Sequence, residues 1–262
     1  MSQITKELKL AVLIDADNVP YSNVKGMMEE IAKFGTPTTK RIYADWTKPN
    51  AGGWKSVLLE HAITPIQQYS YTVGKNSSDS AMIIDAMDLL YSDKVDGFCI
   101  VSSDSDFTRL AIRLRESGMK VIGIGEKKTP NSFIVACDRF IYIEVLDGAI
   151  KKKKPKTTTS TPVADTKDTK KVVEKEVTIK VDNKTIELIE DTIDAIGDDD
   201  GWAFLGDVGN LIVKKKPEFD PRSYGFSKLT PMLKSLTDIL EIDERDSDKK
   251  GIKHVYVRLR YT

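Results

Sequence analysis

Six aspartates in three short motifs are the residues of this sequence best suited to chemistry. They are Asp15 and Asp17, Asp79 and Asp85, and Asp104 and Asp106. The first and third pairs directly follow apolar runs, and the second lies in a helical pattern. Carboxylates gathered at one edge of a sheet repel one another unless a cation neutralises them. The three motifs therefore predict a metal-dependent enzyme that acts on phosphoesters.

The first two motifs differ in how their side chains are expected to point. Asp15 ends an apolar run, and Asn18, three residues later, can either cap the loop or hold the Asp15 carboxylate in position through a hydrogen bond. Asp79 begins a helical pattern and should face the sheet edge. Asp85, six residues later, projects in a different direction on a helix, so it either reaches the site from a deeper position or has a structural role. Lys75 and Asn76, just before this helix, are candidates for contact with a phosphate.

The third motif combines two acids with two hydroxyls beyond a strand-like run. Ser102, Ser103, Asp104 and Asp106 follow GFCIV. Oxygen ligands of this kind are the ones that Mg²⁺ and Mn²⁺ prefer. Asp106 has an alternative role as the cap of a helix that starts near Phe107.

The elements that must position these acids alternate along the first half of the chain. Strand-like apolar runs occupy residues 8–14, 40–45, 62–69, 97–101, 120–125 and 140–145, and helical patterns occupy residues 22–34, 53–61, 77–92 and 106–117. This alternation predicts an α/β fold with a parallel sheet flanked by helices. The carboxyl ends of parallel strands meet at one edge, so the three acidic motifs should converge there.

The chain divides into three parts by composition: residues 1–150, a basic linker at 151–180, and residues 181–262. The linker holds 10 Lys and Arg against 4 Asp and Glu and has no apolar periodicity. It is either a solvated spacer or an electrostatic tether for nucleic acid. The last part contains helical patterns followed by two apolar runs, 239–243 and 252–259, around a polar turn. Helices closed by a hairpin predict a small winged-helix domain.

Composition excludes several other classes of protein. No run approaches the roughly 20 apolar residues of a membrane span, and no signal peptide is apparent, so we expect a cytoplasmic protein with no membrane partner. Cys99 and Cys137 lack CxxC partners, and we expect both to be reduced, buried thiols. The sequence also lacks the motifs of serine hydrolases, P-loop NTPases and dinucleotide enzymes.

Taken together and in order, the motifs resemble those of a known family. IDADN at 14–18, GKNSSDSAMIIDAMDLL at 74–90, VSSDSDF at 101–107 and IGIGEKKTP at 122–130 are similar to the NYN domain, a branch of the PIN-like metal-dependent ribonucleases, and in particular to its bacterial LabA-like group. The resemblance covers about residues 8–146. It implies a metal site of Asp15, Asp79, Asp104 and Asp106 that binds Mg²⁺ or Mn²⁺, with Asp85 as a further supporting acid and Asn18 as the polar partner. Ser102 and Ser103, the hydroxyls of the third motif, are expected in supporting roles.

The segment GWAFLGDVGNLIVKKKPEFDPRSYGFSKL at 201–229 resembles an OST-HTH/LOTUS domain, a winged helix that binds RNA or protein. Its residues suited to RNA contact are Lys214, Lys215, Lys216, Arg222 and Tyr224. Tyr224, with Phe226, has an alternative role in the core. The two resemblances imply an endoribonuclease with a C-terminal RNA-binding domain.

Two other functions remain open at this point. The same fold can serve as a non-catalytic RNA-binding or regulatory adaptor, with a protein partner at the winged helix. The pair Asp15 and Asp17 after a strand is also similar to the paired acids of haloacid-dehalogenase-type phosphatases. That family has a Gly-Thr or Gly-Val continuation where this chain has Asn18, which makes the phosphatase the weaker alternative.

Overall fold

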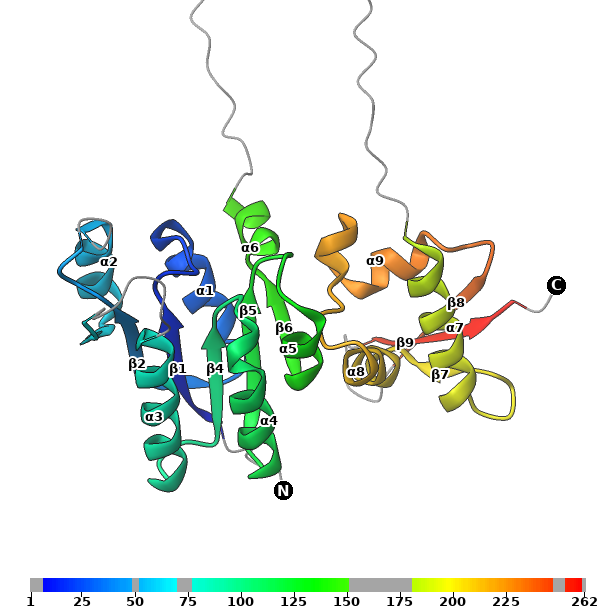
Figure 1. Ribbon diagram of the computed structural model, residues 1–262. Helices are drawn as coiled ribbons and strands as arrows, with labels where there is room; N and C mark the ends of the chain where they lie inside the picture. The colour runs from blue at the N-terminus through cyan, green and yellow to red at the C-terminus, as the bar shows by residue number, and fades with distance from the viewer. Residues whose placement is uncertain (1–6, 49–51, 70–76, 151–180, 247–252, 261–262) are drawn as a thin grey trace, which may run out of the picture.

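The computed structural model describes residues 7–48, 52–69, 77–150, 181–246 and 253–260. They form two units that lie side by side, a larger one with a central sheet and a smaller one of helices and a short sheet (Figure 1). The predictions for Lys75, Asn76 and the linker at 151–180 concern residues outside the described ranges.

The larger unit is built on six parallel strands in the order β3-β2-β1-β4-β5-β6. Their bounds are β1 Lys9–Asp15, β2 Thr36–Ala44, β3 Thr64–Gln67, β4 Gly97–Val101, β5 Lys120–Gly125 and β6 Arg139–Tyr142. The strand order reverses its direction between β1 and β4. In sheets of this kind a crevice forms at that reversal, outside the carboxyl ends of the strands.

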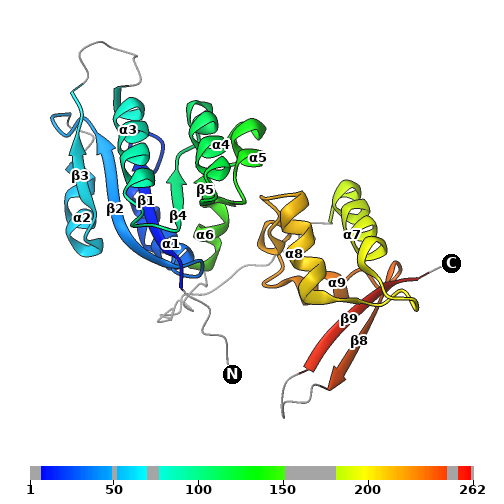
Figure 2. The same ribbon diagram turned by 90° about the horizontal axis from the view of Figure 1, so that it is seen from below.

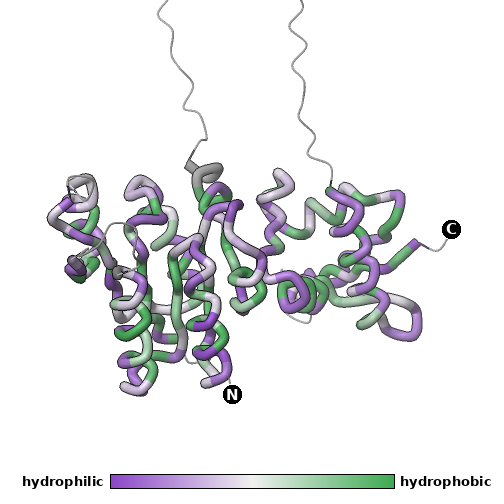
Figure 3. The backbone as a smooth tube through the Cα atoms, viewed as in Figure 1, coloured by the Kyte–Doolittle hydropathy of each residue, from purple (hydrophilic) through white to green (hydrophobic). Residues whose placement is uncertain are grey.

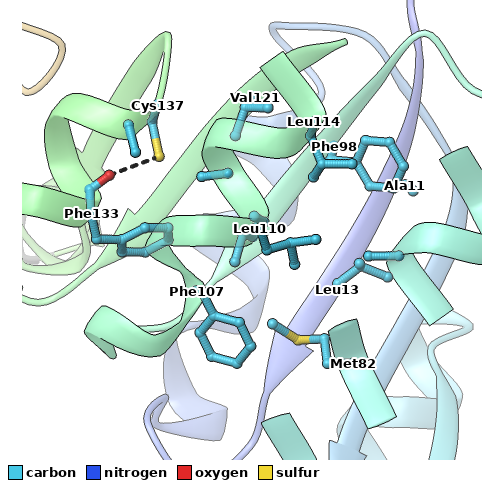
Figure 4. Packing of buried hydrophobic residues seen from close by; sticks show 14 of the residues in the cluster. Ala11, Leu13, Met82, Phe98, Phe107, Leu110, Leu114, Val121, Phe133 and Cys137 are labelled. Atoms are coloured by element: carbon cyan, nitrogen blue, oxygen red, sulfur yellow. Dashed lines mark hydrogen bonds between the residues drawn. The ribbon is translucent and has the colours of Figure 1, made fainter. Parts of the chain in front are cut away.

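Helices cover both faces of this sheet, because the central strands are apolar on both sides (Figure 2). One face carries α3 Ser77–Tyr91, α4 Thr108–Glu116 and α5 Asn131–Ala136, and the other carries α1 Val24–Ile31, α2 Trp54–His61 and α6 Ile143–Ile150. The most hydrophobic stretches lie along the strands between these layers (Figure 3). In the α3 and α4 layer, Leu13, Met82, Phe98 and Leu110 pack in one buried cluster (Figure 4).

The predicted strands and helices of the first half are confirmed, with shifts at their ends. Two helices were not predicted, α5 and α6. The run expected as a strand at 140–145 is divided, since β6 ends at Tyr142 and α6 begins at Ile143. A short apolar run does not reveal its period, so its sequence alone does not distinguish a strand from a buried helix.

The smaller unit has the predicted winged-helix architecture. It contains α7 Asn183–Ile196, β7 Ala203–Phe204, α8 Leu205–Lys215, the 3₁₀ turn η4 Pro221–Tyr224, α9 Leu229–Lys234, β8 Leu240–Asp246 and β9 Lys253–Leu259. β8 and β9 pair antiparallel, as the expected terminal hairpin requires, and β7 joins the far side of β9. Ile189, Val208, Ile212 and Leu233 are buried in its core.

Two expectations from composition can be compared with the described residues. Cys99 and Cys137 are buried free thiols, as predicted, and the Cys137 Sγ donates a hydrogen bond to the Phe133 carbonyl (Figure 4). Among the described helices, none has the length and apolar character needed to cross a membrane.

Candidate metal centre

Asp15 stands at the carboxyl end of β1, where the strand order reverses. Its Oδ2 accepts hydrogen bonds from Asn18 Nδ2 at 2.6 Å and from Ser102 Oγ at 2.9 Å. Its Oδ1 accepts a hydrogen bond from the Asp17 backbone N–H at 3.2 Å. Burial raises the pKa of Asp15, and these hydrogen bonds to the carboxylate oppose the rise. Asn18 therefore makes the hydrogen bond to Asp15 that the sequence suggested.

Asp79 is directed to the same edge by the periodicity of α3. Met82, Ala86 and Leu90 form the buried stripe of this helix, and Asp79 continues that stripe into the first turn. The side chain is consequently buried although it is charged. Burial, followed by the negative charges of Asp15 and Asp104, raises the pKa of Asp79 to about 6.

The loop after β4 supplies the other two acids. The Asp104 Oδ1 accepts a hydrogen bond from the Asp106 backbone N–H at 3.0 Å, which caps the 3₁₀ turn η3 Ser105–Phe107. The Asp104 backbone N–H in turn donates to Ser102 Oγ at 3.1 Å. The cap of this turn is thus Asp104. The helix α4 that follows begins at Thr108, with Phe107 at its N-cap position.

Asp79, Asp104 and Asp106 each place one carboxylate oxygen within 4.8 Å of the others. In the described part of the chain this is the group of acids with a spacing that suits a metal ion. The donors are all oxygen atoms, which fits Mg²⁺ or Mn²⁺ and not a thiolate-preferring metal. Asp15 is outside this group of three, although its charge acts on Asp79. We call Asp79, Asp104 and Asp106 the acidic cluster.

The supporting residues separate into those beside the acidic cluster and one that is elsewhere. Ser102 connects Asp15 to the loop of Asp104. Ser103 Oγ accepts a hydrogen bond from the Glu126 backbone N–H at 2.9 Å and so holds the loop after β5.

Asp85 lies in a different network, between α3 and β2. Its Oδ2 accepts hydrogen bonds from Arg41 Nη1 at 2.9 Å and Tyr43 Oη at 2.8 Å. Burial, then the hydrogen bond to Asp85, raises the pKa of Tyr43 above its ordinary range, so the phenol stays protonated. Asp85 therefore has a structural role, one of the two roles that its sequence position allowed. Its partners are the side chains of Arg41 and Tyr43. No spacing in the sequence pointed to Arg41 or Tyr43, because both are more than 40 positions from Asp85.

The basic and aromatic residues predicted for RNA contact in the smaller unit have diverse surroundings. Lys215 Nζ donates to Thr192 Oγ1 at 3.3 Å, and Lys216 Nζ donates to Thr185 Oγ1 at 3.2 Å. Tyr224 Oη lies 2.9 Å from the same Thr185 Oγ1, and its ring packs against the core of the unit. Arg222 and Lys214 both lie on the side that faces the larger unit.

The chain matches the models of two domain families. The model of the NYN domain matches residues 9–144, just over half of the chain, and that of the OST-HTH/LOTUS domain matches residues 176–252. A crystal structure of a protein of unknown function from Vibrio parahaemolyticus is similar at 21% identity, covering 54% of this chain and 96% of that one, with a TM-score of 0.46. A solution structure of an uncharacterized protein from Nitrosomonas europaea is similar at 27% identity, covering 42% and 94%, with a TM-score of 0.29. No curated protein matches the chain.

Proposed function

This chain belongs to the NYN domain family, within the PIN-like nuclease superfamily, and we propose that it is a metal-dependent endoribonuclease that hydrolyses phosphodiester bonds at the acidic cluster. The observation that carries the proposal is the convergence of Asp79, Asp104 and Asp106 from two separate elements, with donor oxygens within 4.8 Å of one another. Three carboxylates this close are unfavourable without a cation, so their meeting supports a metal site.

The residues of the chain would act by position and charge. Asp79, Asp104 and Asp106 would hold Mg²⁺ or Mn²⁺. A bound divalent cation would supply stabilisation of the negative charge that develops on the phosphate during hydrolysis. Asp15 accepts hydrogen bonds from Asn18 and Ser102, which favour its charged form against the effect of burial, and its negative charge beside the cluster would strengthen the attraction for a cation.

The C-terminal unit is an OST-HTH/LOTUS domain, a kind of domain that binds RNA. We assign to it the retention of the substrate, because the acidic cluster can recognise a phosphodiester but offers little contact to bases. Lys75 and Asn76 precede Asp79 by four and three positions in the sequence, and these two residues are proposed to contact the substrate backbone.

The decisive experiment is cleavage of end-labelled single-stranded RNA by the purified protein in Mg²⁺, in Mn²⁺ and in EDTA. We expect internal cleavage with either metal and none in EDTA. The Asp104→Asn variant should lose cleavage, whereas the matched control Asp88→Asn, an exposed acid on α3, should retain it.

Cleavage in EDTA, or an Asp104→Asn variant as active as the wild type, would contradict the metal-dependent mechanism. If the protein binds RNA but does not cleave it under any metal condition, the nuclease function would be wrong, and the protein would be a non-catalytic RNA-binding adaptor.

A further inference from the structure

The two units are joined by a network of buried charges. Arg222 of η4 donates to both carboxylate oxygens of Glu30 on α1, at 2.8 and 2.9 Å, and also to Asp220 at 2.7 Å. Glu30 and Asp220 are only 6% and 5% exposed. Paired buried charges of this kind hold one geometry, because separating them leaves an uncompensated charge. The network therefore fixes the orientation of the C-terminal domain.

A second set of contacts lies on β6, the last strand of the large sheet. The Phe140 backbone N–H donates to the Pro217 carbonyl at 3.0 Å, and Arg139 Nη1 donates to the Phe219 carbonyl at 2.7 Å. The segment after α8 thus satisfies a backbone group on the open edge of the sheet. In both views of the chain, α8 lies beside the larger unit (Figures 1 and 2).

This docking leaves a groove between the two domains, with a volume of about 720 Å³. Its cationic side chains come from both sides, Lys120 and Arg139 from the sheet and Lys214 and Lys228 from the C-terminal domain. Its apolar wall includes Phe34, Val213 and Leu229. Neither domain alone has this combination, since each contributes part of the charge and part of the wall. We call it the interdomain groove.

The charge of the groove is positive after its ion pairs are considered. Asp138 is the one acidic side chain that lines it within the described ranges, and its carboxylate pairs with Arg115 at 3.2 Å and with Lys120 at 3.9 Å. Arg139 pairs with Asp220 at 3.4 Å. Lys214 and Lys228 are exposed and make no ion pair with any residue that the structure describes. Beyond Lys120, the neighbouring hollow carries Asp96 and Glu116 together with Arg115, so its charges are mixed.

We propose that the interdomain groove binds a single-stranded segment of RNA at a distance from the acidic cluster. Unpaired lysines on the rim fit phosphates, and an apolar wall with an aromatic ring fits the faces of bases. The inference rests on the proposed ribonuclease function and extends it by naming a second substrate site.

Because of the position of the groove, an RNA must have a minimum length to occupy the groove and the acidic cluster at the same time. Lys120 and Arg139 are at the amino ends of β5 and β6, whereas the acidic cluster is at the carboxyl edge of the sheet. A strand as long as β5 spans about 20 Å, and the three strand spacings from β1 to β6 add about 15 Å sideways. One RNA must therefore extend over roughly 25 Å to occupy both sites. A tetranucleotide is too short, and an RNA of about 20 nucleotides is long enough.

The test compares a groove variant, Lys214→Gln with Lys228→Gln, and a control variant, Lys184→Gln with Lys94→Gln. The control removes the same charge at exposed lysines outside the groove. In EDTA, fluorescence anisotropy with the long RNA should show roughly tenfold weaker binding for the groove variant and a salt slope lower by about 1.4, from two lost phosphate contacts. The control should bind as the wild type does. Equal melting temperatures of the three proteins would establish that the folds are intact.

Cleavage in Mn²⁺ provides the second readout. The groove variant should cleave the tetranucleotide at the wild-type rate and the long RNA more slowly at subsaturating concentration. Equal binding of the long RNA by groove and control variants would overturn the proposal, and so would an equal loss of tetranucleotide cleavage. Tighter binding of a polyglutamate peptide than of RNA at the groove would assign it to an acidic protein segment instead. Binding is measured without metal, so the groove is tested even if the protein does not cleave RNA.

Discussion

Asp104 takes part in both the local fold and the acidic cluster. Its carboxylate caps η3 through the Asp106 backbone N–H, and it is also one of the three clustered acids. Asparagine is as good a cap as aspartate, so Asp104→Asn keeps the local structure and removes one negative charge. This substitution therefore separates chemistry from folding.

We predict that Asp104→Asn removes RNA cleavage and leaves the metal-free protein equally or more stable, because repulsion with Asp79 is relieved. Mn²⁺ should raise the melting temperature of the wild type more than that of the variant. Thermal unfolding with Mn²⁺ and with EDTA measures both effects. If Mn²⁺ raises the melting temperature of Asp104→Asn as much as that of the wild type, the ion binds at a site that does not include Asp104.

The raised pKa of Asp79 predicts how the metal-free protein responds to pH. The pKa is about 6 in the fold against an ordinary value of 3.8. Below the ordinary value, both the folded and the unfolded states hold the proton, so the group has no effect. As pH rises toward 6, the unfolded state loses its proton first, and the folded state is increasingly destabilised.

Asp79→Asn should therefore change the free energy of unfolding very little near pH 3 and increase it near pH 7. Urea unfolding in EDTA at both pH values measures the difference. In saturating Mn²⁺ the sign should reverse, because the variant lacks one ligand. A variant no more stable than the wild type near pH 7 in EDTA would contradict the repulsion within the cluster.

At the scale of elements, Asp85 joins α3 to β2. Helix α3 carries Asp79 in its first turn, and the hydrogen bonds from Arg41 and Tyr43 hold the same helix six residues further along, at Asp85. This connection adds to the core packing of Met82, Ala86 and Leu90, which sets the angle of the helix on the sheet and with it the position of Asp79.

Asp85→Asn should lower the free energy of unfolding by about 1 kcal/mol, since a partly exposed charged hydrogen bond is lost. Cleavage by the folded protein at saturating metal should stay within about twofold of the wild type. Chemical unfolding and single-turnover cleavage measure the two quantities, with Asp88→Asn as the control on the same helix. If Asp85→Asn abolishes cleavage without a change in stability, Asp85 would belong to the metal site and the structural assignment would be wrong.

At the scale of the whole molecule, the ionisation of buried acids keeps the two domains together. Burial alone would raise the pKa of Glu30 and of Asp220, but hydrogen bonds from Arg222 hold both below their ordinary values. Both acids are therefore charged near neutral pH, and Arg222 is the cation that they share.

Arg222→Gln should release the docked arrangement, because two buried carboxylates lose their common partner and become hydrated when the domains part. We expect a larger radius of gyration in small-angle scattering and weaker binding of long RNA, with the circular dichroism of both domains retained. Arg245→Gln, an exposed arginine of the same domain, is the matched control. An unchanged radius of gyration would show that the β6 contacts suffice.

The basic linker makes a separate prediction about binding to RNA. Its positive charges should contribute by counterion release, with up to about 0.7 in salt slope for each phosphate contact on a single strand. Replacing Lys151–Lys154 and Lys156 by Gln should flatten the dependence of log affinity on log salt and leave turnover at saturating RNA unchanged. An unaltered slope would identify the segment as a spacer.

Much of the architecture follows from local patterns in the sequence. Alternating apolar runs and helical patterns specify a parallel sheet with helices on both faces, because each pattern buries its own face. Motifs at the ends of parallel strands must then meet at one edge, which brings Asp15 and Asp104 into the same region. The polar turn between two late apolar runs specifies the hairpin in the same local way.

The tertiary structure decided which of these side chains have contact with one another. Asp79 joins Asp104 and Asp106, whereas Asp85 on the same helix turns to Arg41 and Tyr43. That choice depends on the angle between α3 and the sheet, which arises from packing over the whole layer and not from the spacing of six residues. The role of Arg222 was also decided by the tertiary structure. Its sequence context indicates only a basic surface residue, but its hydrogen bond to Glu30, 192 positions away, connects the two domains. Local spacing determines the direction of a side chain on its own element, but partners this distant are determined only when the elements pack.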